Sequence, residues 1–169
     1  MLKKPILTKK KRHLDKRGFF QEIFLLKEFN IKIIFSAVAH SKKRVIRGLH
    51  FQTIKKQTKI INVIKGQILD VAVNLNKKSK NFGKVYKYIL NEGDCLIVPN
   101  NFAHGYECLS QKCIILYHLD NYRNIKGENG ISYNDKDLNI KWVTKKPIIS
   151  KRDKTINSFS EFKKKIKTL

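Results

Sequence analysis

The run Ile68-Leu69-Asp70-Val71-Ala72-Val73-Asn74-Leu75 decides the fold class, because it is short, rich in apolar residues and bounded by turn residues. It is one of several such runs between about Ile60 and Leu119. The others are Val85 to Leu90, Cys95 to Pro99 and Cys113 to Leu119, with turn signals between them at Gly66, Gly83, Gly93-Asp94 and Pro99-Asn100. Short strands that recur at roughly ten-residue spacing predict an all-β sandwich or barrel.

Helix is expected only near the two ends of the chain. Lys27 to Asn30 fits a short helical turn, and Ser158 to Leu169 fits a helix with Ser158 or Ser160 as its N-cap. The 169 residues suffice for one hydrophobic core and contain no internal repeat and no linker rich in Pro, Gly or Ser. We therefore expect residues 1–169 to form a single domain.

The chain carries 37 Lys and Arg against 13 Asp and Glu, a formal net charge of +24. Such a charge ordinarily suggests a polyanionic partner such as nucleic acid. The lysines, however, are spread over nearly the whole chain and do not gather with aromatic residues on one element. This spread is typical of a solvated surface, so we expect no nucleic-acid partner. The charge would still help to attract a small anionic ligand.

Two further absences narrow the class of protein. No apolar run approaches the roughly 18 to 20 residues of a membrane span, and Met1 to Pro5 lacks the apolar segment of a signal peptide, so we expect a cytoplasmic protein without a membrane partner. The cysteines Cys95, Cys108 and Cys113 are odd in number and form no C-x-x-C pair. We expect them to be small buried side chains and not disulfides or zinc ligands.

Candidate site residues begin with Arg47-Gly48-Leu49-His50-Phe51-Gln52, which sets a guanidinium and an imidazole close together in an apolar run. Alone, such a histidine is compatible with a core residue satisfied by one hydrogen bond. Other motifs accompany it, in chain order: Asp15-Lys16-Arg17-Gly18-Phe19-Phe20-Gln21-Glu22, Gln57-Thr58-Lys59, Asp70, Phe102-Ala103-His104-Gly105, Tyr117 and Ser150-Lys151-Arg152-Asp153. Together they resemble the motifs of the dTDP-4-dehydrorhamnose 3,5-epimerase family, from about Arg17 to Asp153.

The resemblance implies a cupin-like jelly-roll barrel with short terminal helices. It implies an isomerase that inverts C3, C5 or both in a nucleotide-diphosphate-linked 4-keto-6-deoxy sugar, without a cofactor. It also implies a homodimer that pairs through its N-terminal strands.

Inversion of a carbon next to a ketone needs a base, a group that holds the enolate oxygen and an acid on the opposite face. The resemblance implies that His50 is the base and Asp153 orients it, that Lys59 contacts the carbonyl or enolate, and that Tyr117 is the acid. A solvated Lys59 and a core Tyr117 are the alternatives. Asp70 could touch the same imidazole or hold a structural hydrogen bond.

A second set of residues is implied to bind the substrate. Arg47 would hold the diphosphate or the carbonyl, since a guanidinium suits bidentate contacts with oxyanions. Positions 47 and 50 would face opposite sides of a regular strand, so we expect a bulge at Gly48. The other implied binding residues are His104, Glu128 and Arg152, with Arg17 and Glu22 acting, in the family, across the dimer interface.

The chain departs from the family pattern around the substrate. Phe35-Ser36-Ala37-Val38 stands where the family has a polar segment, Asn62 replaces an arginine, Arg123 replaces an aromatic residue and Tyr133 replaces a tryptophan. These changes leave open the nucleotide, the sugar and the number of carbons inverted.

The H-x-H pair that opens the usual cupin metal site is replaced by His50-Phe51-Gln52, so we expect no metal. Two alternatives remain. One is a C3-only or C5-only epimerase, or a ketoisomerase, that acts on another nucleotide sugar. The other is a non-catalytic binding barrel.

Overall fold

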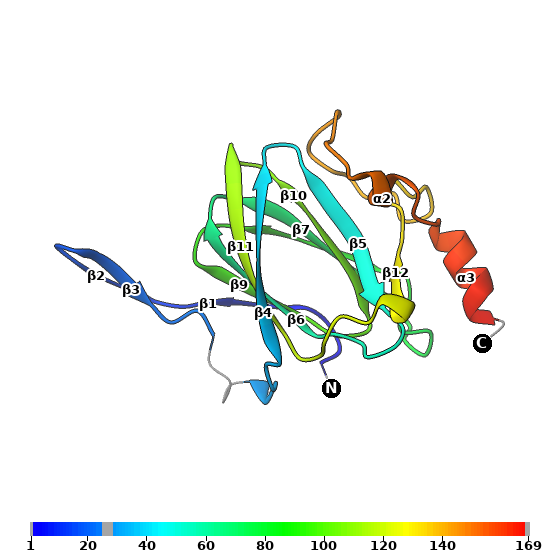
Figure 1. The fold of residues 1–169 in the computed structure, drawn as a ribbon, viewed down its shortest axis with the longest axis horizontal. Helices are drawn as coiled ribbons and strands as arrows, with labels where there is room; N and C mark the ends of the chain where they lie inside the picture. Colours follow the sequence, from blue (N-terminus) through cyan, green and yellow to red (C-terminus); the bar gives the residue numbers. More distant parts are fainter. Residues whose placement is uncertain (1, 25–28, 168–169) are drawn as a thin grey trace.

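Two antiparallel sheets of five strands each pack face to face in the computed structural model, which describes residues 2–24 and 29–167 (Figure 1). The strand orders are β1-β9-β6-β11-β4 and β12-β5-β10-β7-β8, and a two-stranded ribbon, β2-β3, projects to one side. The strands are β1 Ile6–Lys9, β2 Arg12–Asp15, β3 Gly18–Gln21, β4 Phe35–Lys42, β5 Ile46–Gln52, β6 Lys59–Lys65, β7 Ile68–Asn74, β8 Val85–Leu90, β9 Asp94–Val98, β10 Phe102–Cys108, β11 Lys112–Leu119 and β12 Glu128–Gly130. The expected jelly-roll sandwich is confirmed.

Helices are short and few. After the 3-10 turn η1 Ile125–Gly127, the chain forms α2 Lys151–Lys154 and α3 Phe159–Lys167. Ser158 begins α3 as a capping box: its Oγ accepts from the Glu161 N–H at 3.2 Å, and a Glu161 carboxylate oxygen accepts from the Ser158 N–H at 2.6 Å. The expected end of this helix at Leu169, and half of the expected turn at Lys27 to Asn30, lie outside the described residues.

Side chains between the sheets alternate in and out along each strand. In β6, Ile61 and Val63 join the central core with Ile115 of β11, whereas Ile60 faces outward and packs with Ile97. The core fills one end of the sandwich and leaves the other end to polar side chains. The three cysteines are buried and form no disulfide, as expected.

The two central strands of the second sheet are buried on both faces. Every residue of β7 and β10 is buried, because the chain after β12 returns across the outside of this sheet (Figure 1). Phe159 of α3 packs there against a cluster that includes Leu49 and Val73. This return brings α2 next to β5, which matters for the site.

Strand β5 contains the expected bulge. His50 pairs with His104 and Arg47 with Tyr106, so β5 has one residue more than β10 between the two pairs. Gly48 lies in the bulge with φ of +128°, and a Cβ built there would come within 2.5 Å of the Gly105 Cα. Only glycine fits this close approach, and the extra residue lets Arg47 and His50 face the same interior.

Candidate active site

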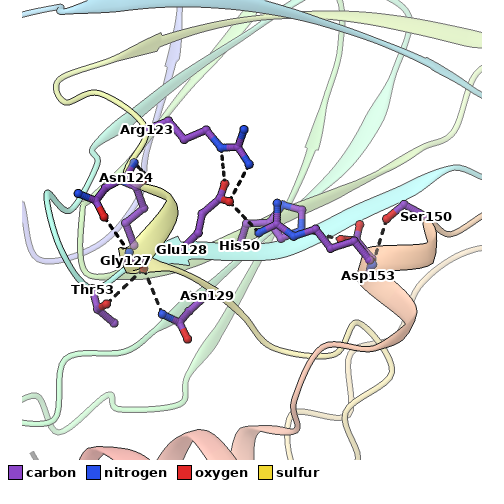
Figure 2. Close-up of polar contacts among 11 residues, drawn as sticks. His50, Thr53, Arg123, Asn124, Gly127, Glu128, Asn129, Ser150 and Asp153 are labelled. Carbon is purple, nitrogen blue, oxygen red and sulfur yellow. Dashed lines mark hydrogen bonds and ion pairs between the residues drawn. The ribbon is translucent and has the colours of Figure 1, made fainter.

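His50 and Asp153 form a hydrogen-bonded pair although 103 residues separate them, with Nε2 and Oδ1 2.8 Å apart (Figure 2). Ser150 caps α2 by accepting from the Asp153 N–H at 3.0 Å, which fixes the carboxylate at the helix start. Burial alone would raise the pKa of Asp153, but the hydrogen bond and charge of His50, helped by the Gly48 N–H, lower it. The carboxylate is therefore ionised and oriented to stabilise an imidazolium.

Lys59 opens β6 from the facing sheet and is buried, which excludes the solvated alternative. Its Nζ donates to the His50 carbonyl oxygen at 2.9 Å. Burial lowers the pKa of Lys59 from 10.5 to about 8, although the negative charges of Asp70 and Glu128 oppose the shift. The ammonium thus lies beside His50 and holds its proton less tightly than an exposed lysine does, which suits a proton donor or an electrostatic partner for an enolate.

Asp70 contacts His104 and not His50. Its Oδ2 lies 2.7 Å from His104 Nε2, and both side chains are buried. Of the two roles expected for Asp70, the structure therefore shows the structural hydrogen bond, with His104 as the partner. Among the described residues, no group pairs with Asp70 Oδ1. Because β7 and β10 are neighbours, the carboxylate fixes the orientation of the His104 ring.

Tyr117 lies on β11, in the sheet opposite His50, and its ring is 6.2 Å from the His104 ring between centroids. Burial raises the pKa of Tyr117 well above its usual value, so the phenol stays protonated near neutral pH. The neighbouring His118 faces outward and bonds Ser36 through Nδ1 at 2.7 Å, as the strand alternation predicts.

Arg47 reaches the same interior and is anchored by two contacts. Its Nε donates to Ser41 Oγ at 3.0 Å and its Nη2 to the His40 carbonyl at 3.1 Å. Tyr106 also contacts Ser41, with the two hydroxyl oxygens 2.8 Å apart. Further N–H groups of the guanidinium remain for a ligand.

Glu128 accepts from two arginines near the opening of the site. Arg123 donates bidentately at 2.9 and 2.8 Å (Figure 2). Arg152 Nη2 lies 3.2 Å from the same carboxylate. The sequence reasoning assigned Glu128 and Arg152 to the site but missed Arg123. The sequence contained a signal for Arg123. It stands where the family pattern has an aromatic residue, so it adds a positive charge to the site.

These side chains line one cavity of about 440 Å³ between the two sheets. The expected site residues around it are Arg47, His50, Lys59, His104, Tyr117, Glu128, Arg152 and Asp153. Phe35, Ala37 and Ala39 of β4 supply an apolar wall, in the region where the sequence departs from the polar segment of the family pattern. The cavity thus combines polar groups from both sheets with one apolar side, as small-molecule sites do.

Arg17 and Glu22 do not line this cavity. Arg17 lies on the projecting ribbon and donates to Asp15, with Nη2 to Oδ2 at 2.6 Å, and Glu22 is exposed just after β3 (Figure 1). Within one chain they are separate from the site, so their expected role needs a second subunit.

Two features are absent from residues 2–24 and 29–167. No three His, Cys, Asp or Glu side chains gather as a metal site would require, and the absence of a metal stays an expectation. In the same part of the chain, no helix is long and apolar enough to cross a membrane.

Comparison with known proteins gives one consistent result. The family model described as dTDP-4-dehydrorhamnose 3,5-epimerase matches residues 1–161. The enzyme of that name from Shigella flexneri is 37% identical over 148 residues, which cover 82% of each chain. The crystal structure of the Bacillus anthracis enzyme with TDP and pyrophosphate bound is 35% identical, with a TM-score of 0.88 over 92% of this chain and 94% of that one.

A third relative was solved with a sugar nucleotide. The Legionella pneumophila epimerase in complex with dTDP-4-keto-L-rhamnose is 29% identical, with a TM-score of 0.88 over 92% of this chain and 88% of that one. The family match spans nearly the whole chain and agrees with the site just described. The protein therefore belongs to the dTDP-4-dehydrorhamnose 3,5-epimerase family.

Proposed function

We propose that this protein, an epimerase by its family, inverts C3, C5 or both in a dTDP-linked 4-keto-6-deoxy sugar, with His50 as the base and Tyr117 as the acid. One observation carries the proposal. His50, paired with Asp153 of α2, and Tyr117 come from opposite sheets and line the same cavity. A base and an acid on two sides of one sugar carbon are what inversion requires.

The proposed reaction starts with removal of the proton next to the C4 ketone by His50. The resulting imidazolium is stabilised by the ionised Asp153, and the enolate oxygen by the ammonium of Lys59. Tyr117 then delivers a proton to the opposite face of the carbon and recovers one from solvent, and the imidazolium of His50 releases the abstracted proton to solvent. No redox change occurs, so the step needs no cofactor.

The substrate proposal rests on the relatives. One was solved with TDP and pyrophosphate, and another with a dTDP-linked keto sugar. A C3-only or C5-only reaction, or a different sugar, remains the second candidate, because the apolar wall of Phe35, Ala37 and Ala39 replaces a polar segment of the family pattern.

The homodimer is part of the proposal. The β2-β3 ribbon exposes three large apolar side chains, Leu14, Phe19 and Phe20, at 79%, 51% and 69%. Monomeric proteins rarely expose so large an apolar patch. We propose that this ribbon packs on a second copy and carries Arg17 and Glu22 to the partner's cavity, where they bind the nucleotide.

Proton NMR in deuterated water tests the reaction. Incubation with dTDP-4-keto-6-deoxyglucose should exchange one deuterium into each carbon that is inverted, which also counts those carbons. No uptake at either carbon from any candidate keto-sugar nucleotide would exclude the epimerase.

A mixing experiment tests the shared site. His50→Ala and the double variant Arg17→Ala/Glu22→Ala should each lose activity, and their mixture should regain part of it, because a mixed dimer contains one cavity with both sets intact. A mixture no more active than its components, or a monomer in light scattering, would reject the shared site.

A further inference from the structure

The cavity opening holds a charge arrangement that none of the roles above uses. Two arginines converge on the single carboxylate of Glu128. Arg123 lies 2.8 Å from its Oε2 (Figure 2), and Arg152 lies 3.2 Å from the same oxygen. Both arginine side chains line the cavity and remain 61% and 48% exposed, whereas Glu128 is 21% exposed. The guanidiniums are thus more accessible to a ligand than the carboxylate that joins them.

Glu128 has little capacity left for a ligand. The hydrogen bonds from Arg123 lower the pKa of Glu128, and Arg152 adds to the effect, so the carboxylate is ionised near neutral pH. Its two oxygens already accept from three N–H groups. Each guanidinium, by contrast, keeps N–H groups that Glu128 does not use. A ligand at the opening would therefore contact the arginines and not Glu128.

Two positive charges against one negative charge leave this opening positive. Planar guanidiniums match the geometry of phosphate oxygens and bind them bidentately. The reacting sugar must lie deep in the cavity beside His50 and Lys59, so the diphosphate attached to it has to pass the opening.

We propose that Arg123 is a further substrate-binding residue, which holds the diphosphate together with Arg152, while Glu128 positions both arginines. The inference rests on the proposed function and adds the residue that replaces the family's aromatic side chain. It assigns Glu128, expected to bind substrate, a positioning role.

Calorimetric titration with dTDP, dTMP and thymidine tests the proposal without turnover. Arg123→Ala should weaken dTDP binding about 10- to 100-fold, the scale of a lost charge-assisted hydrogen bond, and thymidine binding less than about twofold. Lys126→Ala is the matched control, since Lys126 is an exposed lysine in the same loop that does not line the cavity, and it should bind all three ligands as the unaltered protein does. Arg123→Gln keeps a donor toward Glu128 and serves if the alanine variant folds poorly.

A second pair of variants separates direct contact from simple neutralisation of Glu128. If Arg123 touches the diphosphate, Arg123→Ala should still weaken dTDP binding about tenfold or more in a Glu128→Gln background. The proposal is wrong if that loss disappears there, if Arg123→Ala leaves dTDP affinity unchanged, or if thymidine loses as much as dTDP. If the proposed epimerase function is wrong, deuterium uptake will be absent in the NMR experiment while these ligand affinities stay as expected.

Discussion

Removal of His50 and removal of Tyr117 should have different effects, because the proposed reaction uses these residues at successive steps. His50→Ala leaves no group to form the enolate, so both turnover and exchange of the sugar's acidic protons should stop. Tyr117→Phe keeps the base and Lys59, so exchange with retained configuration should survive while inversion falls by roughly 10² or more. Proton NMR in deuterated water measures both. Near-normal inversion by Tyr117→Phe would make Tyr117 a contact residue only.

The buried Lys59, which has a proposed role in the reaction, also lowers the stability of the fold. Burial lowers its pKa to about 8, so the folded state carries a penalty that is full below about pH 8 and fades as the pH rises toward 10.5. Lys59→Met should remove that penalty and lose one hydrogen bond, raising the free energy of unfolding near pH 7 by about 1–2 kcal/mol while turnover collapses. Urea unfolding measures the change. Lys65→Met, exposed on the same strand, should leave both properties unchanged.

The same pKa predicts the alkaline limb of the rate profile. If the enolate needs the ammonium form of Lys59, kcat/KM should fall above about pH 8, by about tenfold for each further pH unit. Tyr117 cannot cause this limb, because its pKa lies well above 10. A profile that stays flat to about pH 9.5 would remove Lys59 from the enolate step.

At the scale of elements, the bulge in β5 sets the geometry of the site. A Cβ at Gly48 would lie 2.5 Å from Gly105 Cα and 2.8 Å from the His104 carbonyl oxygen. Gly48→Ala should therefore lower the free energy of unfolding by about 2 kcal/mol or more and reduce kcat by displacing His50. Gly18 is the matched control, since its φ of +133° is similar but nothing lies within 4 Å. Equal losses in the two variants would show that backbone strain alone, and not the close approach, matters at Gly48.

Strand boundaries were predictable where turn residues flank the strand. Val85 to Leu90 was predicted to the residue, and Cys95 to Pro99 and Cys113 to Leu119 within one residue at each end. Glycine or proline flanks the first two, and Ser110 and Asp120-Asn121 flank the third. Helix α2 was missed, since four residues carry no periodic signal. The partner of Asp70 could not be predicted either, because it depends on β7 lying beside β10, a pairing that strand spacing does not specify.

For the whole molecule, the net charge of +24 should not produce tight nucleic-acid binding, because lysines on every face give weak, salt-sensitive attraction. A band-shift assay at physiological salt should show a Kd weaker than about 1 µM and no sequence preference. Tighter and sequence-dependent binding would contradict the assignment of the charge to a solvated surface.

The site itself was largely predictable at this scale, since its motifs occur in family order, whereas the separation of Arg17 and Glu22 from the cavity required the fold.

The 103-residue gap between His50 and Asp153 has a consequence for the protein during its synthesis. The chain leaves the ribosome from its N-terminus, and domains generally begin to fold in that order. The strands β1 to β11, which supply His50, Lys59, His104 and Tyr117, are complete by Leu119, whereas the orienting carboxylate emerges more than thirty residues later. A nascent chain that ends at Leu119 therefore carries four of the proposed site residues but lacks Asp153, and it also lacks Arg123, Glu128 and Arg152, which complete the lining of the cavity. The site is completed only when the C-terminal segment has been made and α2 has packed against β5.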